Sequence, residues 1–242
     1  MNLYREQGVV LRTWKLGEAD RIVVLMTQGQ GKVRAVAKGV RKTKSRFGGR
    51  LEPFSHVDLS LYRGRELDIV TQAEVVAPFR ALREDYDRVV AGSAMLEAVD
   101  QVAQEREAAV RIYLLLIRAL RTLDGAPRDP SVVLDAFLLK LMALEGYRPA
   151  LGECAGCGRQ VPLRCFSIAR GGGLCDRCRS GEESTLDRAT MPLLAALLGD
   201  DLNATAASIP APASRREAGA LVKGYVEYHL ERRLRAYPMV AR

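Results

Sequence analysis

The hydrophobic pattern of this chain changes its period once, at Pro78, and this change limits the fold more than any other feature. Before Pro78, apolar and β-branched residues form five short runs that are typical of strands, at 6–14, 20–27, 31–38, 55–62 and 66–76. No helical stretch separates these runs. Five consecutive strands favour a small antiparallel barrel, because closure removes exposed sheet edges. An OB-fold is the commonest five-stranded form, and an SH3-like barrel is the alternative.

After Pro78 the apolar residues recur about every 3.6 positions, which indicates helices. The pattern predicts helices at 80–104, 107–123, 131–146, 186–199 and 214–236, with a polar, proline-containing connector at 200–214. The second and third helices are apolar over most of their circumference, so we expect them in the centre of the core. The sequence therefore predicts an α+β protein, with a five-stranded OB-fold barrel at 1–79 and a helical domain at 80–242.

Four cysteines form two C-x2-C pairs separated by 17 residues: Cys154, Cys157, Cys175 and Cys178. This spacing is typical of a structural zinc site, in which four thiolates surround one ion tetrahedrally. Gly156 and Gly158 permit the tight turn that such a site needs. Because four thiolates leave no open coordination position, we expect one zinc ion to stabilise an insertion at about 150–180 without catalysing a reaction. Two redox-active C-x2-C motifs are the alternative.

The positive charge of the chain is concentrated in its first third. Residues 1–80 contain 15 Lys and Arg against 8 Asp and Glu, whereas residues 81–242 contain 22 against 21. The segment from Thr27 to Leu51 contains no acidic residue. Such a local excess favours binding to a polyanion, and a basic face kept for solubility is the alternative.

The residue types in this basic segment suit nucleic acid, because cations neutralise phosphates and aromatic rings stack on bases. No base-reading motif is present, so we expect binding that depends little on nucleotide sequence. Trp14 and Phe47 are the candidate stacking residues. The candidate cations are Arg34, Lys38, Arg41, Lys42, Lys44, Arg46 and Arg50.

Motifs of enzymes are missing from the sequence. The two histidines, His56 and His229, are far apart and are expected to be structural, and Cys165 is expected to be buried among apolar neighbours. The run GQGKV at 29–33 lacks the first glycine of a phosphate-binding loop and predicts a hairpin turn. We therefore expect neither catalysis nor a small-molecule substrate. The lack of a signal peptide and of a long apolar run predicts a cytoplasmic protein without a membrane partner.

Three segments carry a resemblance to a known family: GVVLRTWKLGEADRIVVLMT, GKVRAVAKGVRKTKSRFGGRLEPF and VDLSLYRGRELDIVTQAE. The most specific part is AKGVRK-x-KSRFGG-x-L-x-P. In these segments, and in the order of barrel, helical body and late C-x2-C pairs, the chain resembles the bacterial RecO family of recombination mediators. The resemblance covers essentially the whole chain and is strongest in the first third and the cysteine pairs.

The resemblance implies DNA repair through the RecF pathway and association with the nucleoid. It implies binding to single- and double-stranded DNA, annealing of complementary strands, and help, together with RecR, for RecA to displace single-strand-binding protein (SSB). It also implies that the segment from Lys38 to Arg50 contacts DNA. Some family members lack the zinc cysteines, so the resemblance does not make the metal essential for activity.

The family also binds the acidic C-terminal tail of SSB through its helical domain. Arg118 and Arg121 lie one turn apart on the second predicted helix, beside apolar residues, and are the candidates for this contact. Two solvated arginines at the edge of a core helix are the alternative. Two other functions stay open from the residues alone: a general RNA-binding or ribosome-associated barrel protein, and a zinc-dependent enzyme acting on nucleic acid.

Overall fold

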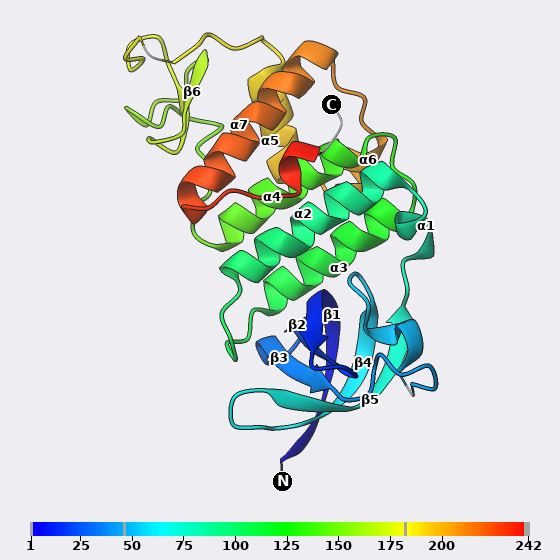
Figure 1. Cartoon of the computed structure of the whole chain (residues 1–242). Coiled ribbons are helices and arrows are strands. Elements are labelled where there is room, and N and C mark those ends of the chain that lie inside the picture. The colour runs from blue at the N-terminus through cyan, green and yellow to red at the C-terminus, as the bar shows by residue number, and fades with distance from the viewer. Residues whose placement is uncertain (1, 46, 182, 240–242) are drawn as a thin grey trace.

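The structure is a computed structural model that describes residues 2–45, 47–181 and 183–239 (Figure 1). A barrel built from the first third of the chain lies at one end, and a helical body covers it. A small β-hairpin with its loops lies at the far end of the helical body (Figure 1). The barrel strands are β1 (Leu3–Leu16), β2 (Asp20–Thr27), β3 (Gly31–Ala37), β4 (His56–Tyr62) and β5 (Asp68–Ala77).

The five strands close in the order β1-β2-β3-β5-β4, and β4 returns to β1. All neighbours are antiparallel except β3 and β5, which pair in parallel through Ala35 with Asp68 and Val36 with Ile69. This closed five-stranded barrel confirms the predicted OB-fold architecture.

The alternating residues from which the third strand was predicted also decide which of its two faces is buried. Val33 and Ala35 of β3 are buried, whereas Lys32, Arg34 and Val36 are half-buried on the other face. Inside the barrel, Val10, Leu25 and Leu59 are completely buried. One face of the strands therefore fills the barrel. The other face meets solvent or, through apolar side chains such as Val24 and Met26 of β2, packs in the same core as the helices.

The helical body follows Pro78, as the change of period predicts. Its helices are α1 (Arg80–Arg83), α2 (Tyr86–Val102), α3 (Val110–Asp124), α4 (Pro130–Leu144), α5 (Thr190–Gly199), α6 (Leu202–Ala207) and α7 (Pro212–Leu230). Every residue from 131 to 139 is buried, so α4 is the central helix, as expected. No helix within the described ranges has the length and apolarity that crossing a membrane would require.

Local backbone and capping geometry explains three of the differences between the predicted and the observed helices. The first predicted helix is broken because the Asp85 side chain caps a new helix by accepting the backbone N–H of Arg88. The polar connector contains α6 because Asp201 accepts the N–H groups of Asn203 and Ala204. The last helix ends early, at Leu230, because Glu231 adopts a left-handed conformation.

Polar contacts fix the barrel against the helical body. His56 of β4 is buried, and its Nε2 lies 2.9 Å from the hydroxyl of Tyr113 on α3. The Nζ of Lys32 donates to the carbonyl of Asp100 at 2.6 Å, and the backbone N–H of Arg106 donates to the carbonyl of Lys32. The two parts of the molecule are therefore joined by hydrogen bonds between residues far apart in the sequence.

Candidate nucleic-acid interface and metal centre

The basic segment forms the loop between β3 and β4, and its first half packs against the turn between β1 and β2. The backbone N–H of Gly39 donates to the carboxylate of Asp20 at 2.7 Å. Arg41 donates its backbone N–H to the carbonyl of Ala19 and its Nη1 to the carbonyl of Gly17, at 3.0 and 3.2 Å. These bonds hold the cations of the loop in a defined position beside the first turn of the barrel.

The second half of the loop is anchored by side chains that are buried in the barrel core. Phe47 is 1% exposed and lies in the barrel core with Leu51, at either end of a short 3-10 turn at Gly48–Leu51. The expectation that Phe47 stacks on a base is therefore wrong, because its ring fills the barrel. The ring closes the barrel under the loop and so positions the cations around it.

Four cations of the loop are exposed and are not in ion pairs with any other described residue: Lys38, Arg41, Lys42 and Lys44. Arg50 is also exposed, and its guanidinium donates to the carbonyl of Ala73 at 3.4 Å. Arg46 lies outside the described residues. Because no carboxylate of the described residues neutralises the four cations, their charge is available to a polyanion.

Arg34 lies apart from this loop. Its guanidinium points from β3 toward the segment after α2 and forms an ion pair with Glu105, with an Nε–Oε1 distance of 3.4 Å. Both side chains are partly exposed, so the pair is open to competition. The charge of Arg34 is therefore already compensated by an acidic residue, unlike that of Lys38, Arg41, Lys42 and Lys44 among the described residues.

Trp14 lies near the end of β1, opposite Ile22 of β2, and is 37% exposed. The guanidinium of Arg12 lies 5.0 Å from the centre of its ring, which is a cation–π contact. Arg12 in turn forms an ion pair with Asp100 of α2, at 2.8 Å. Sequence reasoning missed Arg12, although its position two residues before Trp14 on the same strand indicated a shared face.

The four paired cysteines come together from the loops before and after a short hairpin of β6 (Cys165–Ser167) and β7 (Gly172–Leu174). This hairpin lies at the far end of the molecule (Figure 1). Their sulfur atoms all lie within 4.8 Å of one another, and the sulfurs of Cys157 and Cys175 are 4.0 Å apart. Four sulfurs bound to one zinc ion at about 2.3 Å would be about 3.8 Å apart. The cluster therefore has nearly the size that a tetrahedral metal site requires.

The surroundings of the sulfurs also fit a metal. The backbone N–H of Cys175 donates to the sulfur of Cys154, and this bond lowers the pKa of the Cys154 thiol to about 6, although burial opposes the shift. The neighbouring sulfurs raise the pKa of Cys178 to about 12, so a cation is needed before all four become thiolates. A Cβ atom on Gly156 would lie 2.9 Å from the Cβ of Cys178, which explains the glycine in the turn.

Cys165 is fully buried beside this cluster, as expected, and burial raises the pKa of its thiol. The two histidines are far apart in the fold as well as in the sequence. His56 lies between barrel and helices, and His229 packs among Tyr147, Tyr225 and Tyr228.

Arg118 and Arg121 are exposed on α3 and line one cavity of about 750 Å³ between α3, α4 and the α5–α6 junction. Lys140 of α4 also lines this cavity, and its Nζ donates to the carbonyls of Leu197 and Leu198 at 2.7 and 2.9 Å. Leu115, Leu198 and Leu202 supply apolar lining, and Asp200 and Asp201 lie at the same cavity. Sequence reasoning could not find Lys140, because only the fold brings α4 beside α3.

Comparison with known proteins gives two family matches that follow one another along the chain. Residues 1–79 match the family described as Recombination protein O N terminal, and residues 83–238 match Recombination protein O C terminal. The second match alone covers more than half of the chain. The chain belongs to the RecO family. The resemblance seen in the basic loop and the cysteine pairs is therefore confirmed over both parts of the chain.

Individual RecO proteins are similar over their full length. The chain is 49% identical to the DNA repair protein RecO of Nocardioides sp., with 99% of this chain and all of that protein covered. It is 47% identical to the DNA repair protein RecO of Frankia casuarinae, with both chains fully covered, and 48% identical to that of Streptomyces coelicolor, with 98% of each covered. A role in DNA repair follows from this family membership.

Proposed function

We propose that this chain is a non-enzymatic recombination mediator that binds single- and double-stranded DNA and anneals complementary strands. In this proposal it acts with RecR to help RecA displace SSB. The observation that carries the proposal is the set of exposed, uncompensated cations on the β3–β4 loop, held beside the β1–β2 turn. Membership of a family of DNA repair proteins supports DNA over other polyanions.

In the proposed contact, Lys38, Arg41, Lys42 and Lys44 neutralise successive phosphates and release their counterions, which supplies affinity without reading the sequence. Arg46 and Arg50 of the same loop are included as further candidates. Trp14 offers a partly exposed ring for base stacking, and Arg12 on its other side orients that ring. Arg34 is a weaker candidate, because a phosphate must compete with Glu105 for its guanidinium.

The four cysteines are proposed to hold one structural zinc ion per chain. When bound, zinc supplies charge compensation for the four thiolates and joins the two turns that carry them. Cys154, Cys157, Cys175 and Cys178 would fill all four coordination positions, so the site stabilises the insertion and takes no part in catalysis.

The cavity beside α3 is proposed as the site for the acidic tail of SSB. In this proposal Arg118, Arg121 and Lys140, which line the cavity, would meet carboxylates of the tail, and the leucine side chains would contact its apolar residues. The near-neutral charge of residues 81–242 suits this role, because a short acidic tail needs a local basic rim and not a large positive field.

The DNA contact is tested with a triple variant, Arg41→Ala/Lys42→Ala/Lys44→Ala. A matched control removes three exposed arginines of the helical half, Arg177→Ala/Arg188→Ala/Arg216→Ala. Fluorescence anisotropy with labelled single-stranded DNA should show weaker binding for the loop variant and nearly unchanged binding for the control. Equal affinity of all three proteins would contradict the loop as the interface. Tighter binding to RNA than to DNA of equal length, without annealing, would favour the RNA-binding function instead.

The mediator activity is tested with complementary strands that are coated with SSB, in the presence and absence of RecR. Wild-type protein should anneal the coated strands, and with RecR it should accelerate RecA loading, whereas the loop variant should do neither. Failure of the wild-type protein to anneal coated strands would overturn the mediator proposal.

The tail site is tested by titrating a fluorescent SSB tail peptide into the wild-type protein and two variants. Arg118→Ala/Arg121→Ala should weaken peptide binding, and Arg111→Ala/Arg188→Ala, which removes exposed arginines outside the cavity, should not. If both variants bind like the wild type, the tail lies elsewhere. If the wild type does not bind, the SSB contact is wrong for this chain.

A further inference from the structure

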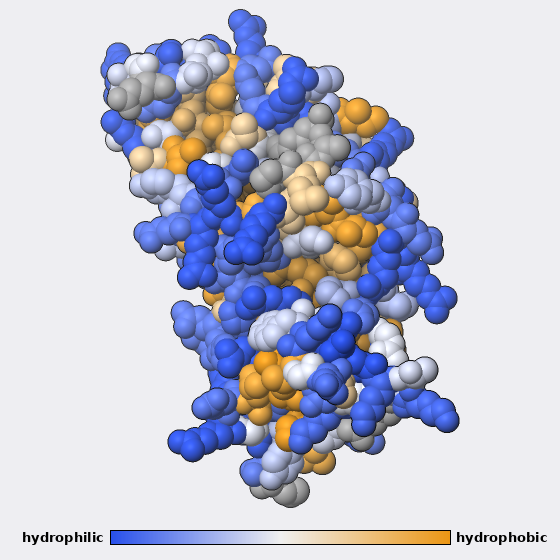
Figure 2. Space-filling view, in the orientation of Figure 1, coloured by the Kyte–Doolittle hydropathy of each residue, from blue (hydrophilic) through white to orange (hydrophobic). Residues whose placement is uncertain are grey.

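A cleft of about 910 Å³ lies where the barrel, α2 and the segment after α7 meet. Leu11 and Phe54 of the barrel and Leu96 of α2 form its apolar lining. Five cationic side chains and two acidic ones also line it: Arg12, Lys32, Arg232, Arg233 and Arg235, with Glu97 and Asp100. Strongly hydrophilic residues cover the visible face where the helical body meets the barrel (Figure 2).

The segment after α7 is fixed in place, so its arginines are presented in a defined position. Leu234, between Arg233 and Arg235, and Tyr237, two residues after Arg235, are buried and anchor the segment. The carboxylate of Glu97 accepts the backbone N–H groups of Arg235 and Ala236 at 3.0 and 3.1 Å. Glu97 therefore holds the backbone, and its carboxylate oxygens are engaged there.

The acidic residues of the cleft do not neutralise these arginines. Asp100 is compensated from the barrel side, by Arg12 at 2.8 Å and Lys32 at 3.6 Å. Among residues 2–45, 47–181 and 183–239, no carboxylate forms an ion pair with Arg232, Arg233 or Arg235. Three guanidiniums on one short segment, without an ion pair to a carboxylate of the described residues, favour a ligand with several negative charges.

The edge of the cleft favours nucleic acid over an acidic peptide. Arg12 lies between the cleft and Trp14, with its guanidinium 5.0 Å from the centre of the indole ring. A strand whose phosphates contact the three arginines would therefore find a guanidinium plane and an exposed aromatic ring next to it, both of which stack on bases. An acidic peptide would use the charges but has no need for the ring.

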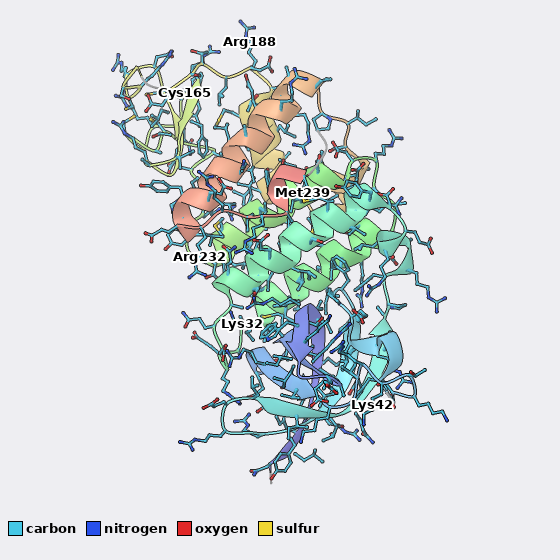
Figure 3. All side chains as sticks on the ribbon, viewed as in Figure 1. Lys32, Lys42, Cys165, Arg188, Arg232 and Met239 are labelled. Carbon is cyan, nitrogen blue, oxygen red and sulfur yellow. The ribbon has the colours of Figure 1, made fainter. Side chains whose placement is uncertain are left out.

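We propose that this cleft binds a second nucleic-acid strand, separate from the strand held by the β3–β4 loop. Arg232 and Lys32 lie on one side of the molecule, whereas Lys42 of the loop lies on the opposite side of the barrel (Figure 3). One chain then holds two strands at once, and the ring of Trp14 can stack on a base of either strand. The inference rests on the proposed DNA binding and explains how annealing brings two strands together.

The test uses the full-length protein and compares Arg232→Ala/Arg233→Ala/Arg235→Ala with the control Arg177→Ala/Arg188→Ala/Arg216→Ala. Both remove three exposed arginines and keep Leu234, Glu97 and Tyr237 in place. Thermal unfolding should be nearly unchanged in both. Titration of labelled single-stranded DNA at low salt should give two strands per chain for the wild type and control, and one for the cleft variant. Annealing of uncoated complementary strands should slow at least tenfold in the cleft variant only.

Combining the variants separates this inference from the proposed function. The loop variant Arg41→Ala/Lys42→Ala/Lys44→Ala should still bind one strand, and adding the cleft substitutions should abolish that binding. Wild-type stoichiometry and annealing rate in the cleft variant would overturn the second-strand site while leaving the loop proposal intact. Loss of RecR or SSB-tail binding with unchanged DNA stoichiometry would also overturn it, because the cleft would then be a protein contact. No DNA binding by the wild type would refute the proposed function itself.

Discussion

His56 is buried at the joint between barrel and helices, where its imidazole meets the hydroxyl of Tyr113. Burial lowers its pKa below the ordinary value, and the positive charge of Arg121 lowers it further against a smaller opposing effect of Asp58. Burial also raises the pKa of Tyr113 to about 12, so the Tyr113 hydroxyl stays protonated and can donate to the neutral imidazole. Protonation of His56 would remove this acceptor and place a charge in the joint.

We expect the free energy of unfolding to fall as the pH drops below about 6.5, because the unfolded chain then binds a proton that folded His56 resists. The stability that comes from keeping His56 neutral is fully present above about pH 6.5. It is lost as the pH falls toward the lowered pKa of His56 in the folded protein, with a slope of at most about 1.4 kcal/mol per pH unit. Urea unfolding of wild type and His56→Gln between pH 5 and 7.5 measures it. His229, whose pKa is also lowered by burial, contributes in the same direction, so His56→Gln/His229→Gln should flatten the curve further. Parallel curves for wild type and His56→Gln would contradict this account.

Gly31 shows why the GQGKV run forms a hairpin turn that accepts no side chain. Its φ is +63°, and a Cβ atom there would lie 1.7 Å from the carbonyl oxygen of Glu107 in the segment between α2 and α3. Gly17 has a similar φ of +58° but no atom within 4 Å of such a Cβ. Gly17→Ala should therefore cost only the left-handed strain of about 1–2 kcal/mol. Gly31→Ala should cost a further 1–3 kcal/mol or so from the overlap, as measured by urea unfolding. Equal losses of stability in the two variants would show that the segment around Glu107 moves aside freely.

Among the structural elements, the two turns that carry the paired cysteines stabilise each other through the metal ion that they are proposed to share. We expect one zinc ion per chain, and we expect Cys154→Ala/Cys157→Ala to lose it and to expose residues 150–186 to proteases. Cys165→Ala is the matched control, because it changes a buried cysteine outside the cluster and should retain zinc. Metal analysis and thiol titration of the native protein provide the measurement. Absence of zinc with four freely titrating thiols would refute the site.

The packing of α7 on α4 depends on one buried cation. The guanidinium of Arg215 donates to the carboxylate of Asp135 at 2.7 Å, with side-chain exposures of 7% and 0%, and Tyr237 donates to the same carboxylate. Arg215→Ala would remove the guanidinium that donates to the buried Asp135 carboxylate, so we expect a loss of about 3–5 kcal/mol in the free energy of unfolding. Arg216→Ala, one residue further and exposed, should change it by less than about 0.5 kcal/mol. Similar effects of both variants would show that the buried pair contributes little.

At the scale of the whole molecule, the uneven charge predicts a strong dependence of DNA binding on salt. If four to six phosphates are neutralised, the logarithm of the association constant should fall against the logarithm of salt with a slope of about −3 to −4 for single strands. The variant Arg41→Ala/Lys42→Ala/Lys44→Ala should make the slope less steep by about 2, because each contact contributes about 0.7. Anisotropy titrations at several salt concentrations measure both. A flat salt response of the wild type would exclude the basic loop as a phosphate contact.

Local patterns in the sequence were enough for the parts of the fold that depend on neighbouring residues. Alternation gave the strands and the buried face of β3, and the 3.6-residue period gave the main helices. The C-x2-C spacing brought two sulfurs together in each pair, because each turn is short, and the β6–β7 hairpin between the pairs completes the cluster. The predicted helix at 80–104 failed at Asp85 because a single capping hydrogen bond outweighs the continuing apolar pattern there.

The barrel, the helical body, the cysteine cluster and the concentration of positive charge in the first third can all be predicted from the amino-acid sequence. Which side chains of that third are available to a ligand depends on the folded chain. It turned Phe47 into the barrel core, paired Arg34 with Glu105, and placed Lys140 beside Arg118 and Arg121. It also brought Arg235 to Glu97, 138 positions away, and so formed the cleft beside Arg12. The physical reason is that periodicity reports which face of an element is apolar, whereas the partner of a charged side chain is set by contacts between elements that are distant in the sequence.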